Sequence, residues 1–229
     1  MNLLDLIFPK RCVSCGKVGK YFCDSCASKI KIVRANQMIC PICEKPAIDG
    51  ITHPRCKSSF TIDGLTAFFR YDGVVRKAIK LLKYRFVSDL AKEFIGLIPL
   101  SSLPITNYQP LTILIPIPLH PSRHRFRGFN QAEVLGKILA ERLNIPMKTD
   151  ILERIKKTTP QVEMKDRKKR LKNMEDVFFV HQLSTTNCEP TTILLFDDVF
   201  TTGATLRVAA NILKRAGAKK VWGVTLAHG

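Results

Sequence analysis

The stretch ILLFDDVFTTGATL, residues 193–206, constrains the fold more than any other part of the chain. Its apolar residues Ile193–Phe196 predict a buried parallel strand, because such strands are apolar on both faces. Asp197 and Asp198 follow where this strand is expected to end, and a threonine-rich turn then leads into an amphipathic helix running to about Arg215. Ligands bind outside the carboxyl ends of strands in open α/β sheets. The stretch therefore predicts an α/β fold with a ligand site at this point.

The turn after the two acids has the chemistry of an anion site. Free N–H groups at a helix N-terminus bind phosphate, glycine permits close approach, and threonine hydroxyls add donors. We expect the acids to hold the ribose hydroxyls of a sugar phosphate and the turn to hold its 5′-phosphate. The residues of this predicted site are Asp197, Asp198, Thr201, Thr202, Gly203, Ala204 and Thr205. Two alternatives stay open: an ordinary strand-to-helix turn whose acids cap the helix, and a nucleotide site for another ligand.

This stretch closely resembles the 5-phosphoribosyl-1-pyrophosphate (PRPP) signature of the type I phosphoribosyltransferases. A second buried strand is predicted at Ile113–Pro118, followed by an arginine-rich segment and then a helix from Phe129. A strand that runs into cations and a helix N-terminus indicates a second anion site on the same sheet edge. In the phosphoribosyltransferases this place belongs to the pyrophosphate loop. The resemblance implies pyrophosphate binding by Arg123, Arg125 and Arg127, although a basic turn without a ligand is the alternative.

Seven of the eight cysteines lie before residue 57; six form three pairs separated by two residues, and the seventh has the same spacing from a histidine. The pairs are Cys12-x2-Cys15, Cys23-x2-Cys26 and Cys40-x2-Cys43, followed by His53-x2-Cys56. Tetrahedral zinc takes four sulfur or nitrogen ligands, and each such knuckle supplies two ligands from one tight turn. The spacing therefore predicts zinc sites, and disulfides are the less favoured alternative for a chain expected in the cytosol.

Two ways of pairing the knuckles are open. Sequential pairing gives one site of Cys12, Cys15, Cys23 and Cys26, and a second site of Cys40, Cys43, His53 and Cys56. A cross-braced arrangement would join the first knuckle to the third and the second to the fourth. We favour the sequential form, a double zinc ribbon, because each ribbon then closes locally. Zinc is expected to be structural, since four protein ligands leave no open position.

The chain is strongly basic, with 37 Lys and Arg against 19 Asp and Glu, a net charge of +18. Such an excess favours polyanionic partners, nucleic acid among them, although solubility alone would also explain it. No apolar run approaches the roughly 18 residues that span a bilayer. The first residues, MNLLDLIFPKRC, lack the pattern of a secretory signal. We therefore expect a cytoplasmic protein without membrane insertion.

The remaining chain adds further elements of an α/β domain. Strands are predicted at Leu65–Tyr71 and Val221–Leu226, and a helix begins at Gly73. Basic residues cover the outer surface of that helix, as a solvated face or as a surface that follows a phosphate backbone. Four aromatic residues near basic ones are candidates for stacking on nucleobases, although a core position is the simpler expectation for most; they are Tyr71, Tyr84, Phe86 and Phe126. The highly charged segment Glu153–Asp176 is predicted to be a mobile flap.

In combination these pieces resemble the ComF/GntX family of competence-associated phosphoribosyltransferase-like proteins, over nearly the whole chain. The matching residues are the knuckles from Cys12 to Cys56, Arg76, Leu82-Lys83-Tyr84, Ile115–Pro121, Arg127–Ala132, Thr159-Pro160-Gln161, Arg170, Asn173, Asp197-Asp198-Val199 and Thr201–Thr205. His53 departs from the pattern, because the family usually has cysteine there. The resemblance implies a cytoplasmic protein of natural transformation that handles incoming single-stranded DNA beside a ComFA-type helicase and recombination mediators.

These observations predict a double zinc ribbon at residues 1–60 and a type I phosphoribosyltransferase (Rossmann-like) domain at residues 61–229, a parallel sheet with helices on both faces. Two functions remain open. One is a DNA-handling protein whose PRPP site binds the sugar phosphate with Mg²⁺. The other is an active, Mg²⁺-assisted phosphoribosyltransferase of nucleotide or carbon metabolism. The sequence identifies neither a catalytic residue nor the acceptor.

Overall fold

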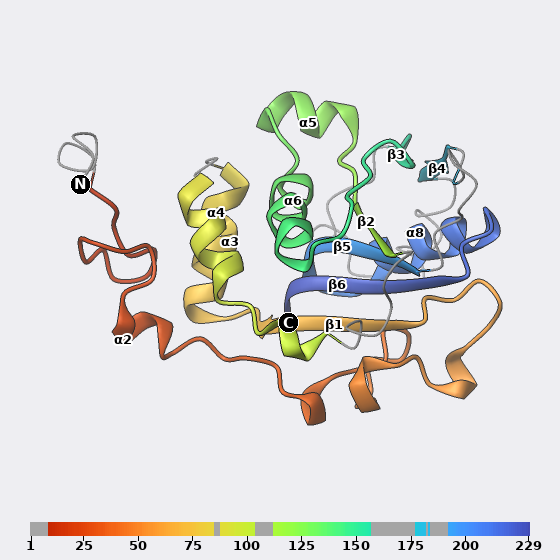
Figure 1. Cartoon of the computed structure of the whole chain (residues 1–229), viewed down its shortest axis with the longest axis horizontal. Helices are drawn as coiled ribbons and strands as arrows, with labels where there is room; N and C mark the ends of the chain where they lie inside the picture. Colours follow the sequence, from red (N-terminus) through yellow and green to blue (C-terminus); the bar gives the residue numbers. More distant parts are fainter. Residues whose placement is uncertain (1–8, 85–87, 104–111, 157–176, 182, 184–191) are drawn as a thin grey trace.

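The computed structural model describes residues 9–84, 88–103, 112–156, 177–181, 183 and 192–229. At its centre is a four-stranded sheet with the strand order β1-β6-β5-β2 (Figure 1). The strands are β1 (Gly64–Arg70), β2 (Thr112–Pro116), β5 (Thr192–Phe200) and β6 (Lys220–His228). Every neighbouring pair is parallel, and Ile193 in the central strand β5 lies opposite Ile113 and Val221. The predicted parallel sheet is confirmed.

Helices cover both faces of this sheet. The main helices are α3 (Gly73–Tyr84), α4 (Ser88–Gly96), α6 (Gln131–Leu143) and α8 (Ala204–Arg215). Successive side chains of a strand point to opposite faces, so β5 contributes side chains to a hydrophobic core on each face of the sheet. Leu194 and Phe196 pack with α3, α4 and α6, whereas Ile193 and Leu195 pack with α8. The predicted arrangement of the α/β domain is therefore correct.

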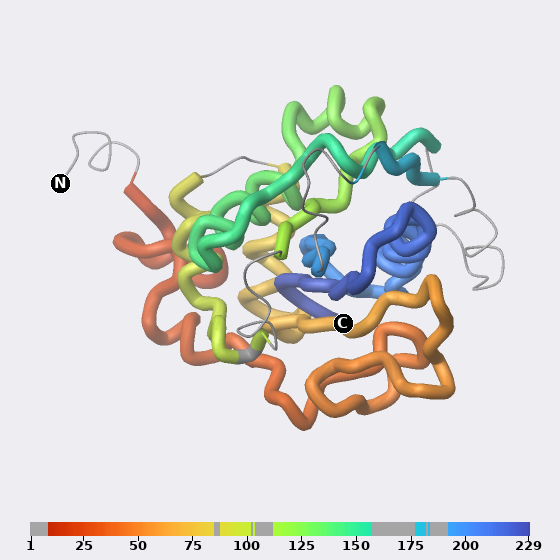
Figure 2. The backbone as a smooth tube through the Cα atoms, turned by 45° about the vertical axis from the view of Figure 1, so that its right-hand side comes forward, coloured from red at the N-terminus to blue at the C-terminus, as the bar shows by residue number. Residues whose placement is uncertain are grey.

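The N-terminal segment lies against the same domain. It runs beneath β1 in both views, coloured red to orange (Figures 1 and 2). Ile32 pairs antiparallel with Phe69 and Ile51 with Gly64, so the segment covers the free edge of β1. Its short helical turns are α2 (Asp24–Ala27), η1 (Ala35–Gln37), η2 (Ile48–Gly50) and η3 (Pro54–Cys56), and η4 (Leu100–Ser102) follows α4.

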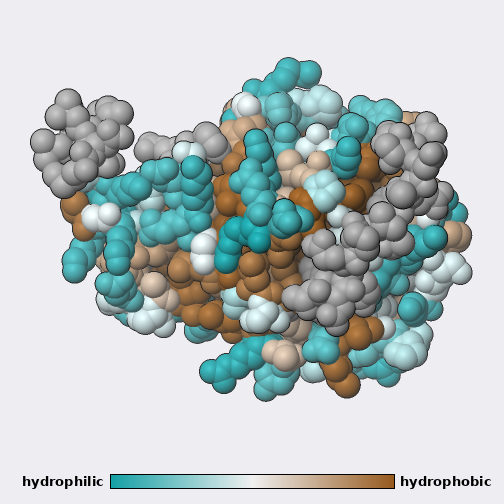
Figure 3. Space-filling view, viewed as in Figure 1, coloured by the Kyte–Doolittle hydropathy of each residue, from teal (hydrophilic) through white to brown (hydrophobic). Residues whose placement is uncertain are grey.

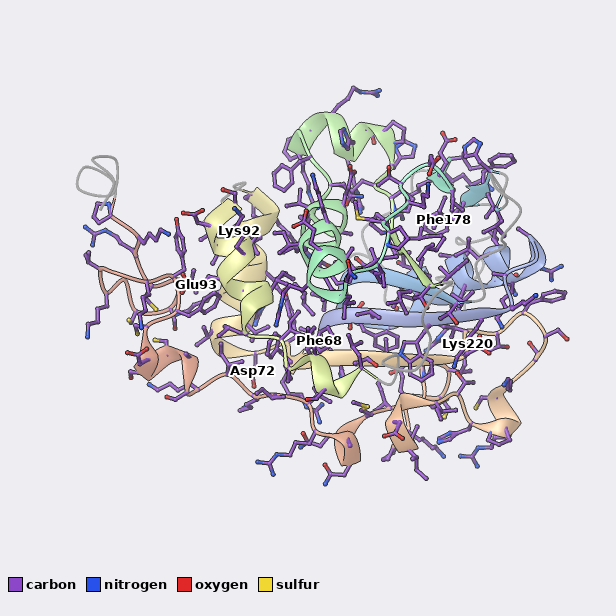
Figure 4. All side chains as sticks on the ribbon, in the orientation of Figure 1. Phe68, Asp72, Lys92, Glu93, Phe178 and Lys220 are labelled. Carbon is purple, nitrogen blue, oxygen red and sulfur yellow. The ribbon has the colours of Figure 1, made fainter. Side chains whose placement is uncertain are left out.

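The first cysteine ribbon packs on α4. The rings of Phe22 and Phe94 stack with centroids 5.4 Å apart. Glu93, labelled in Figure 4, accepts a hydrogen bond from the backbone N–H of Phe22 at 2.9 Å. The N-terminal ribbons and the α/β domain thus share an interface, and the division near residue 60 stays a prediction.

Two expectations about the charged segments need correction. The arginine-rich segment, expected as a pyrophosphate loop between β2 and a helix from Phe129, is itself a helix, α5 (Pro121–Arg127), and the next helix begins at Gln131. Proline is favoured in the first turn of a helix, and the His120 side chain caps α5 by accepting the N–H of Ser122. The predicted flap Glu153–Asp176 begins as part of a strand, β3 (Leu152–Arg154), which pairs antiparallel with β4 (Phe178–Val180).

Arg154 of β3 is buried, contrary to the prediction that the whole charged segment Glu153–Asp176 is a mobile flap. Strand alternation explains this difference, because Leu152 and Arg154 point inward while Glu153 points outward. The rest of the predicted flap, residues 157–176, lies outside the described residues, together with the family-matching residues Thr159–Gln161, Arg170 and Asn173.

Candidate functional site

The acid pair lies within β5 and not after its end. The strand continues to Phe200, which lies opposite His228 of β6, so the sequence-based end at Phe196 is four residues too early. The charged side chains do not end the strand, because backbone pairing with β6 continues past them. Asp198 points to the α3 side, where it forms an ion pair with Lys83 (Oδ2 to Nζ 2.9 Å). Asp197 points to the other side and accepts the backbone N–H of Asp198 at 2.8 Å.

Burial and mutual repulsion control the charge of this pair. Burial, followed by the negative charge of Asp198, raises the pKa of Asp197 to about 7. For Lys83, burial acts to lower the pKa, but the charge of Asp198 outweighs it and the net shift is upward. At neutral pH Asp197 is therefore a mixture of protonated and ionised forms, beside the Lys83–Asp198 ion pair. Such a pair is ready to accept hydroxyl protons or to face a cation.

The predicted phosphate turn follows β5 and begins α8. Gly203 has φ of +68°, a left-handed conformation, and caps the helix that starts at Ala204. A Cβ on Gly203 would lie 2.5 Å from the Phe200 ring, so glycine is required here both for its backbone angle and for space. Thr201 is exposed and Thr202 and Thr205 are half-buried. The structure thus brings the acid pair and the whole turn to one end of β5.

Arg207, in the first turn of α8, ties this turn to the second cysteine ribbon. Its Nε donates to the carbonyl oxygen of Pro41 at 2.6 Å, and its guanidinium forms an ion pair of 3.0 Å with Glu44. Both partners belong to the knuckle between Cys40 and Glu44, whose N–H···O bond (Glu44 to Cys40, 2.9 Å) closes the tight turn. The start of α8 is therefore held by the fold of that knuckle.

The three predicted pyrophosphate arginines of α5 point in different directions. Arg123 acts electrostatically on Arg154, whose guanidinium also feels the charge of Asp197. Burial, and then Arg123, lower the pKa of Arg154. Arg127 donates a hydrogen bond of 2.8 Å to Gln131, and Arg125 is exposed. Among the described residues, Arg123 is the one arginine of α5 whose charge acts on Arg154, the cation on which Asp197 also acts.

A cleft of about 310 Å³ opens between the end of β2 and the β3–β4 pair. It is lined by Pro118, Leu119, Pro121, Thr149, Asp150, Leu152, Glu153, Arg154 and His181. Arg154 extends over the ring of Phe178, 5.5 Å from its centroid, and Phe178 is labelled in Figure 4. The cleft thus contains a buried cation, Arg154, on which the charge of Asp197 acts.

The cysteine and histidine side chains gather in two groups with the predicted sequential pairing. The first group is Cys12, Cys15, Cys23 and Cys26, the second is Cys40, Cys43, His53 and Cys56, and the ligand atoms within each lie within 4.8 Å of one another. A tetrahedral site with Zn–S bonds of about 2.3 Å places sulfur atoms about 3.8 Å apart. The Cys15 and Cys23 sulfurs are 3.6 Å apart, which fits.

His53 is oriented as a metal ligand. Its Nδ1 lies 3.3 Å from the sulfur of Cys43, and its Nε2 lies 3.0 Å from the carbonyl oxygen of Pro46. Donation from Nε2 to that carbonyl assigns the proton to Nε2 and leaves the Nδ1 lone pair for the metal, the usual arrangement of zinc-bound histidine. The backbone N–H of Lys45 contributes most to lowering the pKa of Cys43 to about 6, which favours the thiolate.

Comparison with known proteins agrees with these two parts. The profile of the double zinc ribbon domain matches residues 3–57, and that of the phosphoribosyl transferase domain matches residues 130–229. The ribbon match supports structural zinc in the N-terminal part of the chain. No helix among the described residues is long and apolar enough to cross a membrane.

Several curated relatives align with the chain. Competence protein ComFC of Streptococcus pneumoniae is 31% identical over 204 residues, which cover 87% of this chain and 84% of the relative. Competence protein F of Haemophilus influenzae is 36% identical over 118 residues, half of each chain. DNA utilization protein YhgH of Salmonella typhimurium is 27% identical over 208 residues, covering 87% of this chain and 86% of the relative. The chain belongs to the ComF family of proteins with a double zinc ribbon and a phosphoribosyltransferase domain.

Sequence reasoning missed three residues of the site. Lys83 was grouped with the surface charges of its helix, and Arg154 with those of a flap. Arg207 carried no signal, because its partners lie in a knuckle about 160 residues away in the sequence (separations of 163 and 166). The family-matching Leu82-Lys83-Tyr84 was the only pointer to Lys83.

Proposed function

We propose that this protein acts in natural transformation, where it handles incoming single-stranded DNA and binds PRPP with Mg²⁺ at the end of β5. The observation that carries the PRPP site is the joint position of the acid pair and the Gly203 turn on one strand end. The names of the relatives, competence and DNA utilization proteins, support the biological role. A net charge of +18 supports a polyanionic partner.

Each part of PRPP has a proposed contact. Asp197 and Asp198 hold the ribose hydroxyls, and residues 201–205 hold the 5′-phosphate through backbone N–H groups and threonine hydroxyls. The pyrophosphate lies toward Arg123, whose charge acts on the neighbouring cation Arg154. Mg²⁺, when bound, neutralises the pyrophosphate. Arg127 supports this region through Gln131 and is not assigned a direct contact.

The proposed zinc ligands are the two groups described above, with Cys12, Cys15, Cys23 and Cys26 in one site and Cys40, Cys43, His53 and Cys56 in the other. Four protein ligands in each leave no open position, so the zinc ions stabilise the ribbons and take no part in chemistry. In the cytoplasm, a ComFA-type helicase and recombination mediators are the proposed neighbours of the protein on the DNA.

A second candidate function is catalysis of phosphoribosyl transfer. Arg154 and Arg123 favour it, because Arg154, on which Asp197 acts, and its neighbouring cation Arg123 provide positive charge where a pyrophosphate leaving group gains negative charge. In that reaction the bond from the anomeric carbon to pyrophosphate breaks, pyrophosphate leaves with the electron pair, and an acceptor nucleophile bonds to the same carbon.

Calorimetric titration of PRPP into the zinc-loaded protein, with and without Mg²⁺, tests the proposed site. We expect binding that strengthens with Mg²⁺, and weaker binding of ribose 5-phosphate, which lacks the pyrophosphate. Absence of binding at millimolar PRPP would overturn the PRPP site.

A separate titration of labelled oligothymidine at low salt tests the DNA role. Release of pyrophosphate in the presence of both PRPP and the oligonucleotide would establish the second candidate function, phosphoribosyl transfer.

A further inference from the structure

Two aromatic side chains stand in solvent among cations. Tyr84 of α3 is 73% exposed and Phe126 of α5 is 84% exposed. Of the other two aromatic candidates for base stacking, Tyr71 packs against the core and Phe86 lies outside the described residues. A single exposed ring needs no explanation. Two rings at one end of the sheet, each within a run of positive charge, are a distinct feature of the surface.

On α3, the exposed ring ends a basic stripe. Arg76, Lys80 and Tyr84 are spaced by four residues, so they lie on one side of the helix, and all three are exposed. The ion pairs of the described residues involve neither Arg76 nor Lys80. Lys83 beside them turns inward to Asp198. The stripe therefore ends at the rim of the acid-pair site.

On α5, the exposed ring lies between arginines. His124, Arg125 and Phe126 are exposed, and the sequence of this helix, PSRHRFR, contains no acid. Arg123, one turn earlier, is the residue that acts on Arg154 beside Asp197. One side of α5 thus faces the cleft while the other faces solvent with an unbalanced charge and an open ring.

Both aromatic positions border the same site. The end of α3 is held there by the Lys83–Asp198 ion pair, and Pro121 at the start of α5 lines the cleft that contains Arg154. The end of α3 and the whole of α5 lie on the upper side of the molecule in two views (Figures 1 and 2). Hydrophilic residues gather over α5 at the top of Figure 3.

We infer that this two-helix surface, formed by Arg76, Lys80 and Tyr84 of α3 and by His124, Arg125 and Phe126 of α5, is where single-stranded DNA binds. The inference rests on the proposed function and adds the location and the mode of binding. Phosphates contact the arginines and lysine, and unpaired bases stack on the two rings. A duplex offers no free base faces along its length, so the rings select single strands. A DNA strand bound to this surface would pass the rim of the proposed PRPP site.

The test compares Phe126→Ala and Tyr84→Ala with the full-length wild-type protein in binding fluorescein-labelled oligothymidine, followed by anisotropy. Loss of one stacked base weakens binding about 5- to 100-fold. Phe126→Trp retains a stacking face and should bind within about threefold of wild type. Ile48→Ala is the matched control, because Ile48 is also 84% exposed but lies on η2 in the second ribbon. Thermal melting checks that each variant is folded.

Salt titrations separate stacking from charge. Each phosphate contact contributes about 0.7 to the slope of log affinity against log salt for a single strand. Arg125→Ala should lower that slope by about this amount, whereas Phe126→Ala should weaken binding with the slope unchanged. Binding of a blunt duplex of the same length should be insensitive to Phe126→Ala.

Three outcomes overturn the inference in distinguishable ways. If wild-type protein binds oligothymidine but both alanine variants bind equally well, DNA lies elsewhere and the proposed function survives. If Phe126→Ala weakens duplex and single strand alike, the ring does not stack on unpaired bases. If the wild-type protein fails to bind oligothymidine at low salt, the DNA role and this surface both fail.

Discussion

Arg207 donates a hydrogen bond of 2.6 Å from its Nε to the carbonyl oxygen of Pro41, joining the first turn of α8 to the Cys40–Cys43 knuckle of the second ribbon. The same guanidinium pairs with Glu44 at 3.0 Å. The proposed phosphate turn and the proposed second zinc site are thus neighbours in the fold, although the sequence places them at opposite ends of the chain. Further along α8, Lys214 pairs with Asp63 at 2.7 Å, so the helix is held at more than one point.

We predict that Arg207→Met lowers the free energy of unfolding by about 1.5–3 kcal/mol, the range for hydrogen bonds that involve a charged group. It should also weaken PRPP binding several-fold, because the first turn of α8 loses its anchor. The exposed Arg215→Met, on the same helix, is the control and should change either quantity little. Urea unfolding and calorimetry provide the measurements, and equal effects of the two variants would refute the anchoring role.

The two zinc sites should differ in their effect on PRPP binding. Cys15→Ser and Cys43→Ser each remove one ligand, so we expect each variant to retain one zinc ion per chain instead of two, measured by mass spectrometry of the metal content. Only Cys43→Ser should weaken PRPP binding, since the second ribbon contacts Arg207 and the first ribbon packs on α4. Similar PRPP affinities for both variants would show that the knuckle does not position α8.

His53 gives an independent test of the second site. Because the imidazole Nδ1 faces Cys43 while Nε2 faces the Pro46 carbonyl, His53→Cys should keep the zinc ion and His53→Ala should lose it. The metal content of the purified variants, together with their thermal midpoints, gives the result. Retention of both zinc ions by His53→Ala would remove His53 from the ligand set.

Local patterns were sufficient to predict most of the fold. The apolar run Ile193–Phe196 identified the central strand, because both of its faces are buried. The two-residue spacing of the cysteines predicted the ligand groups, since a knuckle is formed by neighbouring residues. The acid pair and Gly203 were also found, because one strand and one turn hold them all.

Contacts between distant elements could not be predicted in the same way. Lys83 looks like any other lysine on a basic helix, and only the packing of α3 over the end of β5 brings it to Asp198. Arg154 looks like part of a charged run, and only its place in β3 buries it. The true end of β5 was missed because charged side chains are uncommon inside buried strands, and pairing with β6 overrides that preference.

The raised pKa of Asp197 predicts a specific dependence of stability on pH. Its pKa is about 7 in the folded protein and near the ordinary 3.8 in the unfolded chain. Between these values the folded state holds a proton that the unfolded state has lost, so this group lowers the free energy of unfolding as pH rises. This destabilising effect of Asp197 is absent below about pH 4 and reaches its full size above about pH 7.

Asp197→Asn should therefore be more stable than wild type above pH 7, by an amount on the order of a few kcal/mol. The difference should shrink toward pH 4, where the wild-type carboxyl is protonated. Asp198→Asn is the matched control, and it should be destabilised because Lys83 loses its buried partner. Both variants should lose PRPP binding. Urea unfolding across this pH range gives the stability differences, and parallel curves for Asp197→Asn and wild type would contradict the assignment. If Asp197→Asn stabilises the protein and abolishes PRPP binding, the Asp197 carboxyl serves ligand binding at a cost in stability.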